Sequence, residues 1–172
     1  MRRKDREVKD FSEIIAILER CSVLHLAMIS EGQPYSVPVN FGYVLGDADG
    51  AQKLTVYFHG AGEGTKITAL KENPAVCFSA VASAETGAIG DSGNPCNWSC
   101  YYESVIGAGK VTFLKSSDSA ERTLAMDSLM RHCGYTLPAG VKTIAYNAMA
   151  LARTAVGKIE VTEITGKRHA KK

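Results

Sequence analysis

The feature that most constrains the fold of this 172-residue chain is a succession of short apolar segments separated by turns. Several of these segments alternate apolar and polar residues, which is typical of half-buried β-strands. Glycine, proline and aspartate cluster between them, so neighbouring strands can pair antiparallel. Strands are expected at residues 23–28, 34–43, 53–59, 75–81, 101–113 and 154–164.

Helical signals are fewer. A capping box at Asp10 precedes apolar residues at helical spacing, and proline at position 74 ends a second helical pattern. Residues 83–99 are rich in glycine and predict an irregular loop, either a functional loop or a plain insertion. Because strands outnumber helices, the pattern predicts a mainly β (α+β) fold, a small antiparallel barrel with flanking helices. Helices are expected at residues 11–20, from the glycine-rich segment to Leu70, from Ser117 onward and, weakly, at 141–150.

Composition and charge narrow the functional classes. The apolar content of 45% and charged content of 22% are those of a globular protein, and the length predicts a single domain over residues 1–172. A formal net charge of +2 gives no reason to expect nucleic-acid or membrane binding. No apolar run approaches the roughly 20 residues that span a bilayer, and the charged N-terminus is unlike a signal peptide, so a cytoplasmic location is expected.

The basic residues gather at the two chain ends, at residues 2–6 and 166–172. The last of these, residues 168–172, are expected to form a frayed tail, because chain ends are usually poorly ordered. The alternative is that the termini supply charge to an anionic ligand at a subunit interface. The cysteines number five and show no repeated spacing, which favours reduced structural thiols over disulfides or a metal site.

A glycine-rich segment between an expected strand and an expected helix is the strongest local signal for a ligand. Gly60, Gly62 and Gly64 would let the main chain approach a phosphate, and Thr65 and Lys66 would stand at the helix start. A helix start offers free backbone N–H groups, and a lysine adds a point charge. The spacing fits neither a Walker loop nor a dinucleotide fingerprint, so a flexible turn with a surface lysine remains the alternative.

The wider sequence resembles the pyridoxamine-phosphate-oxidase-like split-barrel flavoproteins, and within them the nitroimidazole-resistance group. The segments that carry the resemblance occur in order along most of the chain. They are residues 1–6, 32–43, 57–61 with Gly64 and Lys66, 96–98, 102–107, 129–132 and 165–168.

This resemblance implies an antiparallel split β-barrel that forms a homodimer, with two FMN molecules at the interface and each FMN touching both chains. The implied cofactor residues fall in four segments: Pro38, Val39, Asn40 and Phe41 along the isoalloxazine; His59, Gly60 and Ala61 beside the ring and ribityl chain; Gly64, Thr65 and Lys66 at the phosphate; and Ser104 on a second strand. The chain departs from the family at Gly60 and Gly62, where side-chain-bearing residues are expected, and matches poorly over residues 134–153.

The implied activity is reduction of a small substrate by FMN, with a nitroaromatic compound as one candidate substrate. A nicotinamide cofactor or another donor would supply the electrons. His59 is the candidate catalytic residue, because an imidazole can carry a proton near neutral pH; a structural histidine is the alternative. A second class of function is a non-catalytic module that binds flavin, haem or deazaflavin.

Overall fold

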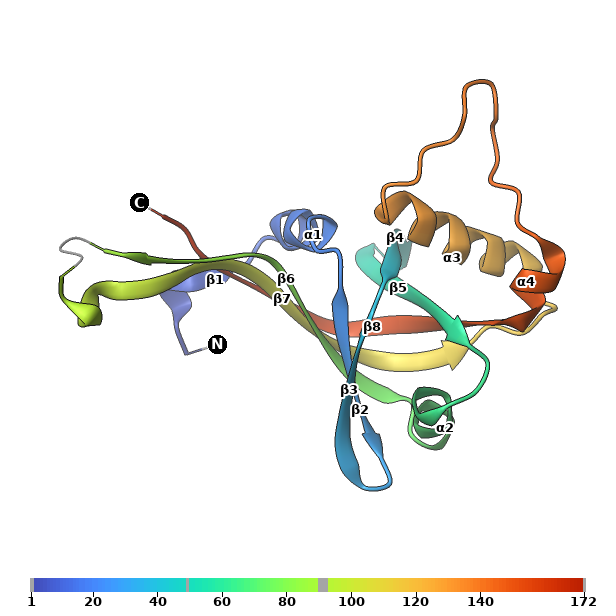
Figure 1. Cartoon of the computed structure of the whole chain (residues 1–172), viewed down its shortest axis with the longest axis horizontal. Coiled ribbons are helices and arrows are strands. Elements are labelled where there is room, and N and C mark those ends of the chain that lie inside the picture. Colours follow the sequence, from blue (N-terminus) through green and yellow to red (C-terminus); the bar gives the residue numbers. More distant parts are fainter. Residues whose placement is uncertain (1, 49, 90–92, 172) are drawn as a thin grey trace.

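A single antiparallel sheet organises the chain, whose computed structural model describes residues 2–48, 50–89, 93–171 (Figure 1). The sheet has 8 strands, seven of them in the order β3-β2-β6-β7-β8-β5-β4, with β1 paired to β8. The sheet does not close, because β3 and β4 lie at opposite ends of this order, and the result is a split barrel with flanking helices. The strands are β1 (Glu7–Val8), β2 (Leu24–Ser30), β3 (Gln33–Val39), β4 (Phe41–Ala48), β5 (Ala51–Ala61), β6 (Ala75–Ala88), β7 (Trp98–Phe113) and β8 (Thr154–His169).

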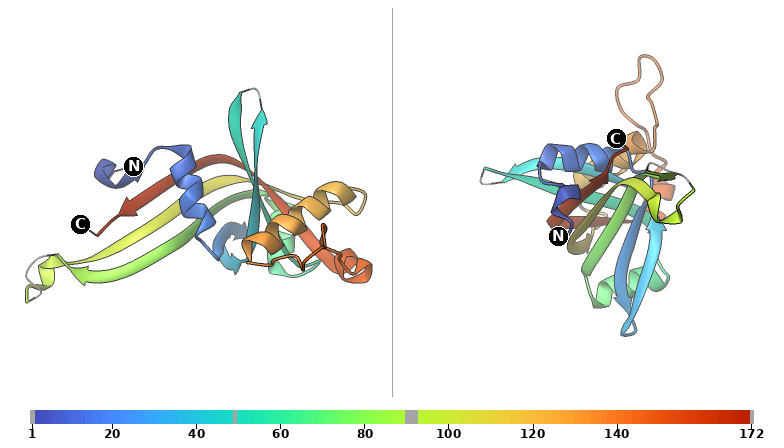
Figure 2. Two further views of the ribbon diagram at one scale, coloured as in Figure 1. Left: turned by 90° about the horizontal axis from the view of Figure 1, so that it is seen from above. Right: turned by 90° about the vertical axis from the view of Figure 1, so that its left-hand side faces the viewer.

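The predicted fold class, an antiparallel split barrel with helices on its outside, is confirmed. The helices are α1 (Phe11–Glu19), α2 (Thr65–Glu72), α3 (Ser119–His132) and α4 (Ala148–Arg153), with short 3-10 turns at Lys4–Arg6 and Pro95–Asn97. The Asp10 carboxylate accepts a hydrogen bond of 3.1 Å from the Glu13 amide and so caps α1, as its capping box predicts. Helix α3 lies along β4, and α2 packs against β2 (Figures 1 and 2).

Aromatic rings packed against glycines fill the barrel core. Phe58 and Phe78 are fully buried, and a Cβ added at Gly157 or Gly107 would lie 2.2 or 2.3 Å from their rings. Both glycines are therefore required by close approach, because no side chain fits between the strand and the ring. Gly107 of β7 and Gly157 of β8 thus mark the points where these strands pass directly over a buried ring.

A second core lies between α3 and the sheet, and it contains a buried charge. Arg122 is 6% exposed, and its guanidinium donates to the carbonyls of Leu114, Leu151 and Thr154 at 2.8 to 3.0 Å. These bonds tie α3 to the end of β7, to α4 and to the first residue of β8. Helix α3 begins near the predicted position, but Asp118 at its N-cap makes no side-chain hydrogen bond to the helix.

Four local predictions were wrong. Residues 34–43 do not form one strand, because the chain breaks at Asn40 and passes from β3 to β4 at the two ends of the sheet order. The helix expected at 141–150 is short and begins at Ala148. The loop expected at 83–99 is strand at both of its ends: β6 continues to Ala88 and β7 begins at Trp98, and the two form a two-stranded arm that projects from the barrel (Figure 2).

The fourth error concerns the C-terminal tail, residues 168–172. Strand β8 continues through His169, paired with Tyr102 of β7. Arg168 makes ion pairs of 2.6 Å with Glu103 and 3.0 Å with Glu13. Carboxylates on β7 and α1 therefore hold this basic end of the chain. The sequence of the chain end does not reveal these partners, because they lie far away along the chain. Lys172 lies outside the described residues.

Candidate functional site

The passage from β5 to α2 leaves the start of a helix without a cap. Gly64 occupies the N-cap position with φ +106°, a conformation that favours glycine, and it has no side chain to accept from the first-turn amides. Its carbonyl accepts from the Ile67 and Thr68 amides, and the first turn contains no acidic residue. The exposed Thr65 opens the helix, so an external anion would meet free N–H groups and the positive end of the helix dipole.

Lys66, the next residue, is half-buried and lies close to the end of β5. Its Nζ is 5.3 Å from the centroid of the Phe58 ring, and none of the ion pairs found in the described part of the chain includes it. Burial lowers the pKa of this amino group below its ordinary value. A Cβ at Gly60 would lie 2.9 Å from Nζ, so the glycine that departs from the family pattern leaves room for the ammonium beside the strand.

His59 lies beside this lysine and has an unsatisfied ring nitrogen. The side chain is half-buried, and its Nδ1 is buried without a hydrogen-bond partner in the described structure. Burial lowers the pKa of the imidazole, and the positive charge of Lys66 lowers it further. A buried nitrogen without a partner costs free energy, and a ligand that offers it a hydrogen bond would recover that cost.

The predicted residues before β4 lie at the same end of the barrel. Phe41 is fully buried and pairs with Phe58 across β4 and β5, which brings Asn40 level with His59. The Asn40 amide nitrogen donates to the Ser22 carbonyl at 3.4 Å. Pro38 and the buried Val39 pair with β2, the strand against which α2 packs. Residues 59–61 and 64–66 therefore meet at Lys66, and the strand register sets Asn40 and Phe41 level with His59 and Phe58. We call residues 38–41, 59–61 and 64–66 the Lys66 cluster.

The chain also matches a known family along most of its length. The Pyridoxamine 5'-phosphate oxidase family model matches residues 10–168, which include every residue of the Lys66 cluster. The chain belongs to the pyridoxamine 5'-phosphate oxidase family. No curated protein matches it.

Solved structures of family-like proteins agree with this placement. A candidate 5-nitroimidazole antibiotic resistance protein from Bacteroides thetaiotaomicron is 31% identical, with a TM-score of 0.72 over 94% of this chain and 85% of that one. The flavocytochrome Anf3 of Azotobacter vinelandii is 21% identical, with a TM-score of 0.73 over 99% of this chain and 72% of that one. A FAD- and heme-binding protein of Mycobacterium smegmatis is 20% identical, with a TM-score of 0.74 over 96% and 74%. The predicted resemblance is thereby confirmed, and the last two structures establish a shared fold.

The fourth predicted segment of the family site lies far from the other three. Ser104 pairs with Lys167 of β8, whereas His59 pairs with Val156 of the same strand. Eleven positions of a strand extend roughly 36 Å at about 3.3 Å per residue. Within one chain, Ser104 therefore lies outside the Lys66 cluster.

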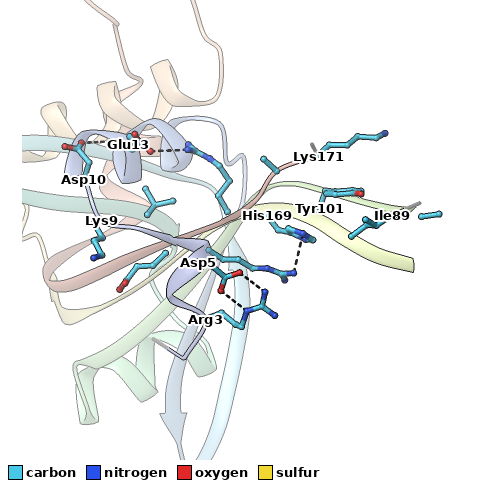
Figure 3. Close-up of a pocket in the computed structure, with 15 residues that line it drawn as sticks. Arg3, Asp5, Lys9, Asp10, Glu13, Ile89, Tyr101, His169 and Lys171 are labelled. Atoms are coloured by element: carbon cyan, nitrogen blue, oxygen red, sulfur yellow. Dashed lines mark hydrogen bonds and ion pairs between the residues drawn. The ribbon is translucent and has the colours of Figure 1, made fainter. Parts of the chain in front are cut away.

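A cavity that the sequence does not predict lies at the other end of the sheet. It has a volume of about 1110 Å³, and the two chain ends, the start of α1 and the arm line it (Figure 3). The basic termini were the available signal, and they were interpreted mainly as a solvated tail. Among the described residues, no cluster of three or more His, Cys, Asp or Glu side chains could hold a metal ion. Nor does any described helix have the length and apolarity needed to cross a membrane.

Proposed function

We propose that the Lys66 cluster binds FMN through its phosphate, and that the protein is a flavin-dependent reductase of a small substrate. The observation that carries this proposal is the half-buried ammonium of Lys66, which has no ion-pair partner among the described residues and stands at an uncapped helix start. A desolvated cation beside free N–H groups is complementary to a phosphate dianion. A solvated surface lysine would need neither feature.

The residues of the cluster divide into those for the phosphate and those for the rest of the cofactor. Lys66, the Thr65 hydroxyl and the first-turn amides of α2 would hold the phosphate, and Gly64 would let the main chain come close to it. Residues 38–41 and 59–61 would lie along the ring and ribityl chain. The His59 Nδ1 atom, which has no partner in the described structure, would gain one there. A bound flavin would supply the electron transfer, while the chain binds it, orients it and excludes water.

We propose a homodimer as the functional unit, with Ser104 of one subunit placed near the Lys66 cluster of the other. The distance of roughly 36 Å along β8 supports this arrangement, because one chain alone does not bring the two segments together. The face around Ser104 is also apolar: Val81 pairs with Ser104 and is 51% exposed, and Ile106 on the same face is 54% exposed. Exposed apolar groups on a sheet face favour burial against another chain.

The substrate proposal rests on the 31% identical relative. That protein is described as a 5-nitroimidazole antibiotic resistance protein, which supports a nitroaromatic compound as the substrate of this chain. His59 is proposed to deliver a proton to the reduced substrate, and a nicotinamide cofactor is the proposed electron donor. A non-catalytic cofactor-binding module is the second candidate, supported by the flavocytochrome and the FAD- and heme-binding protein among the structural neighbours.

The absorbance spectrum of the purified protein, with mass identification of any released cofactor, tests the cofactor directly. We expect a yellow protein that releases FMN in a ratio of about one per chain. A Soret band, a deazaflavin or a colourless protein that does not take up FMN in equilibrium dialysis would contradict the proposal. The FMN-loaded protein is then mixed with NADH or NADPH and a 5-nitroimidazole: consumption of both distinguishes the reductase from the binding module.

A further inference from the structure

The cavity of about 1110 Å³ lies at the end of the sheet opposite the Lys66 cluster (Figure 3). The N-terminal segment forms one side, the end of β8 forms the floor, and the arm of β6 and β7 forms the other side. Its volume is slightly above the roughly 300–1,000 Å³ that ligand pockets commonly measure, so a small organic ligand has room in it. What such a ligand would have to be follows from the charges and rings on these walls.

Most of the charged side chains on the cavity wall are already neutralised. Arg3 binds Asp5 through two hydrogen bonds of 2.8 and 2.6 Å. Arg168 is held by Glu13 and Glu103, and Lys171 lies 2.9 Å from Glu85. These cations therefore need no ligand to balance them.

Arg6 differs from these residues. In the described structure it forms no ion pair with a carboxylate, and its Nε is buried without a hydrogen-bond partner. The pKa of Asp5 is lowered mainly by its hydrogen bond to Arg3 and slightly by the nearby charge of Arg6, so this carboxylate already has a partner in Arg3. A partly buried guanidinium without a counter-ion is costly, and a planar anion could satisfy it with paired hydrogen bonds.

The neighbours of Arg6 fix its position and add positive charge. His169 Nδ1 lies 2.7 Å from the Cys100 carbonyl and must donate to it, so in the neutral ring Nε2 accepts from Arg6 Nη2 at 3.3 Å. Although burial would raise it, the pKa of Tyr102 is lowered by hydrogen bonds from Lys167 and Arg6. The guanidinium of Arg6 is therefore held in place beside His169 and Tyr102, and Lys167 lies 5.5 Å from the Tyr102 ring centroid as a second cation.

The opposite side of the cavity is aromatic and apolar. The Tyr101 ring packs on the His169 ring with centroids 5.1 Å apart and planes inclined by 32°. Ile89, which follows the last residue of β6 at the far end of the arm, is 51% exposed. Figure 3 shows Ile89, Tyr101 and His169 along the same side of the cavity. A flat, apolar ring would cover these groups and remove them from water.

We propose that this cavity is a second binding site, which takes a small aromatic anion. Its phosphate or carboxylate pairs with Arg6, and its ring packs against Tyr101 and Ile89. Both halves of the ligand contribute, because the anion meets Arg6, the guanidinium that has no carboxylate partner among the described residues of the cavity wall, while the ring covers Tyr101 and Ile89. The inference does not depend on flavin binding at the Lys66 cluster.

Titration calorimetry of the full-length protein with phenyl phosphate tests this site. The protein is first saturated with FMN, and the titration is repeated on Lys66→Met without FMN, so that binding at the Lys66 cluster is excluded in two ways. We expect Arg6→Gln to weaken phenyl phosphate binding roughly ten- to hundredfold, the usual effect of losing a charge-assisted hydrogen bond. Arg3→Gln is the matched control: the same residue type on the same cavity wall, already paired with Asp5, should change the affinity less than threefold.

The apolar half of the site has its own variant. Tyr101→Leu should weaken phenyl phosphate binding several-fold and leave inorganic phosphate binding unchanged, and it keeps the proposal testable if Arg6→Gln unfolds. Benzoate in place of phenyl phosphate shows whether the site prefers a carboxylate or a phosphate. Failure of phenyl phosphate and benzoate to bind, or an equal loss in Arg3→Gln and Arg6→Gln, would overturn the proposal. Binding that persists in Lys66→Met without FMN supports it even if the flavin proposal fails.

Discussion

Replacing Lys66 by methionine separates the phosphate contact from every other contribution to cofactor binding. Methionine keeps an unbranched apolar stem over the Phe58 ring and removes only the ammonium, whose Nζ lies 5.3 Å from the ring centroid. We expect the affinity for FMN to fall and the affinity for riboflavin, which has no phosphate, to stay the same. The comparison of the two ligands on one variant therefore isolates the interaction of the charge with the phosphate.

The size of the loss follows from the environment of Lys66. A hydrogen bond to a charged group contributes about 1.5–3 kcal/mol, which corresponds to roughly a ten- to hundredfold change in dissociation constant. The half-buried position places Lys66 toward the upper part of this range, because water screens the pair less than at the surface. Lys71, an exposed lysine at the end of the same helix, is the matched control, and Lys71→Met should leave FMN affinity unchanged.

The stability of the cofactor-free protein is a second measurement. Lys66→Met should raise this stability, although it lowers the affinity for FMN. Because burial lowers the pKa of Lys66, the unfolded chain holds this proton more strongly than the folded one. The resulting cost is fully present below the folded pKa and vanishes as pH rises toward the ordinary value of 10.5. Cofactor-free Lys66→Met should therefore be more stable than the unmodified chain at pH 7, and the difference should shrink as the pH approaches 10.5.

Fluorescence quenching of FMN and riboflavin measures both affinities, and chemical denaturation at several pH values measures the stability. Equal losses for FMN and riboflavin would mean that Lys66 shapes the site rather than binding the phosphate. Unchanged FMN affinity in Lys66→Met would remove the phosphate assignment altogether.

Three further changes test other parts of the structure. Ile106→Asp should convert the expected dimer to a monomer in sedimentation experiments and abolish FMN binding; a dimeric variant would move the interface elsewhere. His59→Ala should keep the fold and part of the FMN but lose turnover or change its pH dependence, whereas a structural histidine would cost melting temperature and leave turnover per bound FMN normal. Arg122→Met should destabilise the protein by about 2–4 kcal/mol in denaturant titrations, because it leaves buried carbonyls without donors. A loss below about 1 kcal/mol would show that water replaces the lost guanidinium donors. Arg131→Met, at an exposed position of the same helix, is the control.

The sequence predicts most elements of the barrel because their signals are local. The capping box at Asp10, the alternation in residues 53–59 and proline at position 74 each act within one turn or one strand, and the structure has helix or strand where they predict it. The split of the segment 34–43 at Asn40 has no such signal. The residues on both sides of Asn40 have a strand-like pattern. They form two strands because the first half pairs with β2 and the second half pairs with β5.

The arm and the continuation of β8 from residue 165 to His169 were missed for a related reason. Glycines and small polar residues in 83–99 indicate a loop by local propensity, yet β6 and β7 continue pairing through them because each supplies the other's backbone partners. Likewise the basic residues after Thr165 look like a solvated end until Glu13 and Glu103, far away in sequence, neutralise Arg168. In both cases the deciding partner is distant along the chain.

The candidate site shows the same limit at the level of the assembly. Local chemistry was enough to find Lys66, since a helix start, glycines and a lysine are adjacent in sequence. In the proposed dimer, Ser104 joins the site only through a second chain: it lies on the outer face of β7, between exposed Val81 and Ile106, while Val105 beside it is fully buried in the core. A sheet face that exposes apolar side chains on two neighbouring strands, here Val81 of β6 and Ile106 of β7, is suited to packing against another sheet. If two such faces pack together, each brings its Ser104 to the partner and covers the apolar side chains at once, so loss of the dimer and loss of the flavin should occur together.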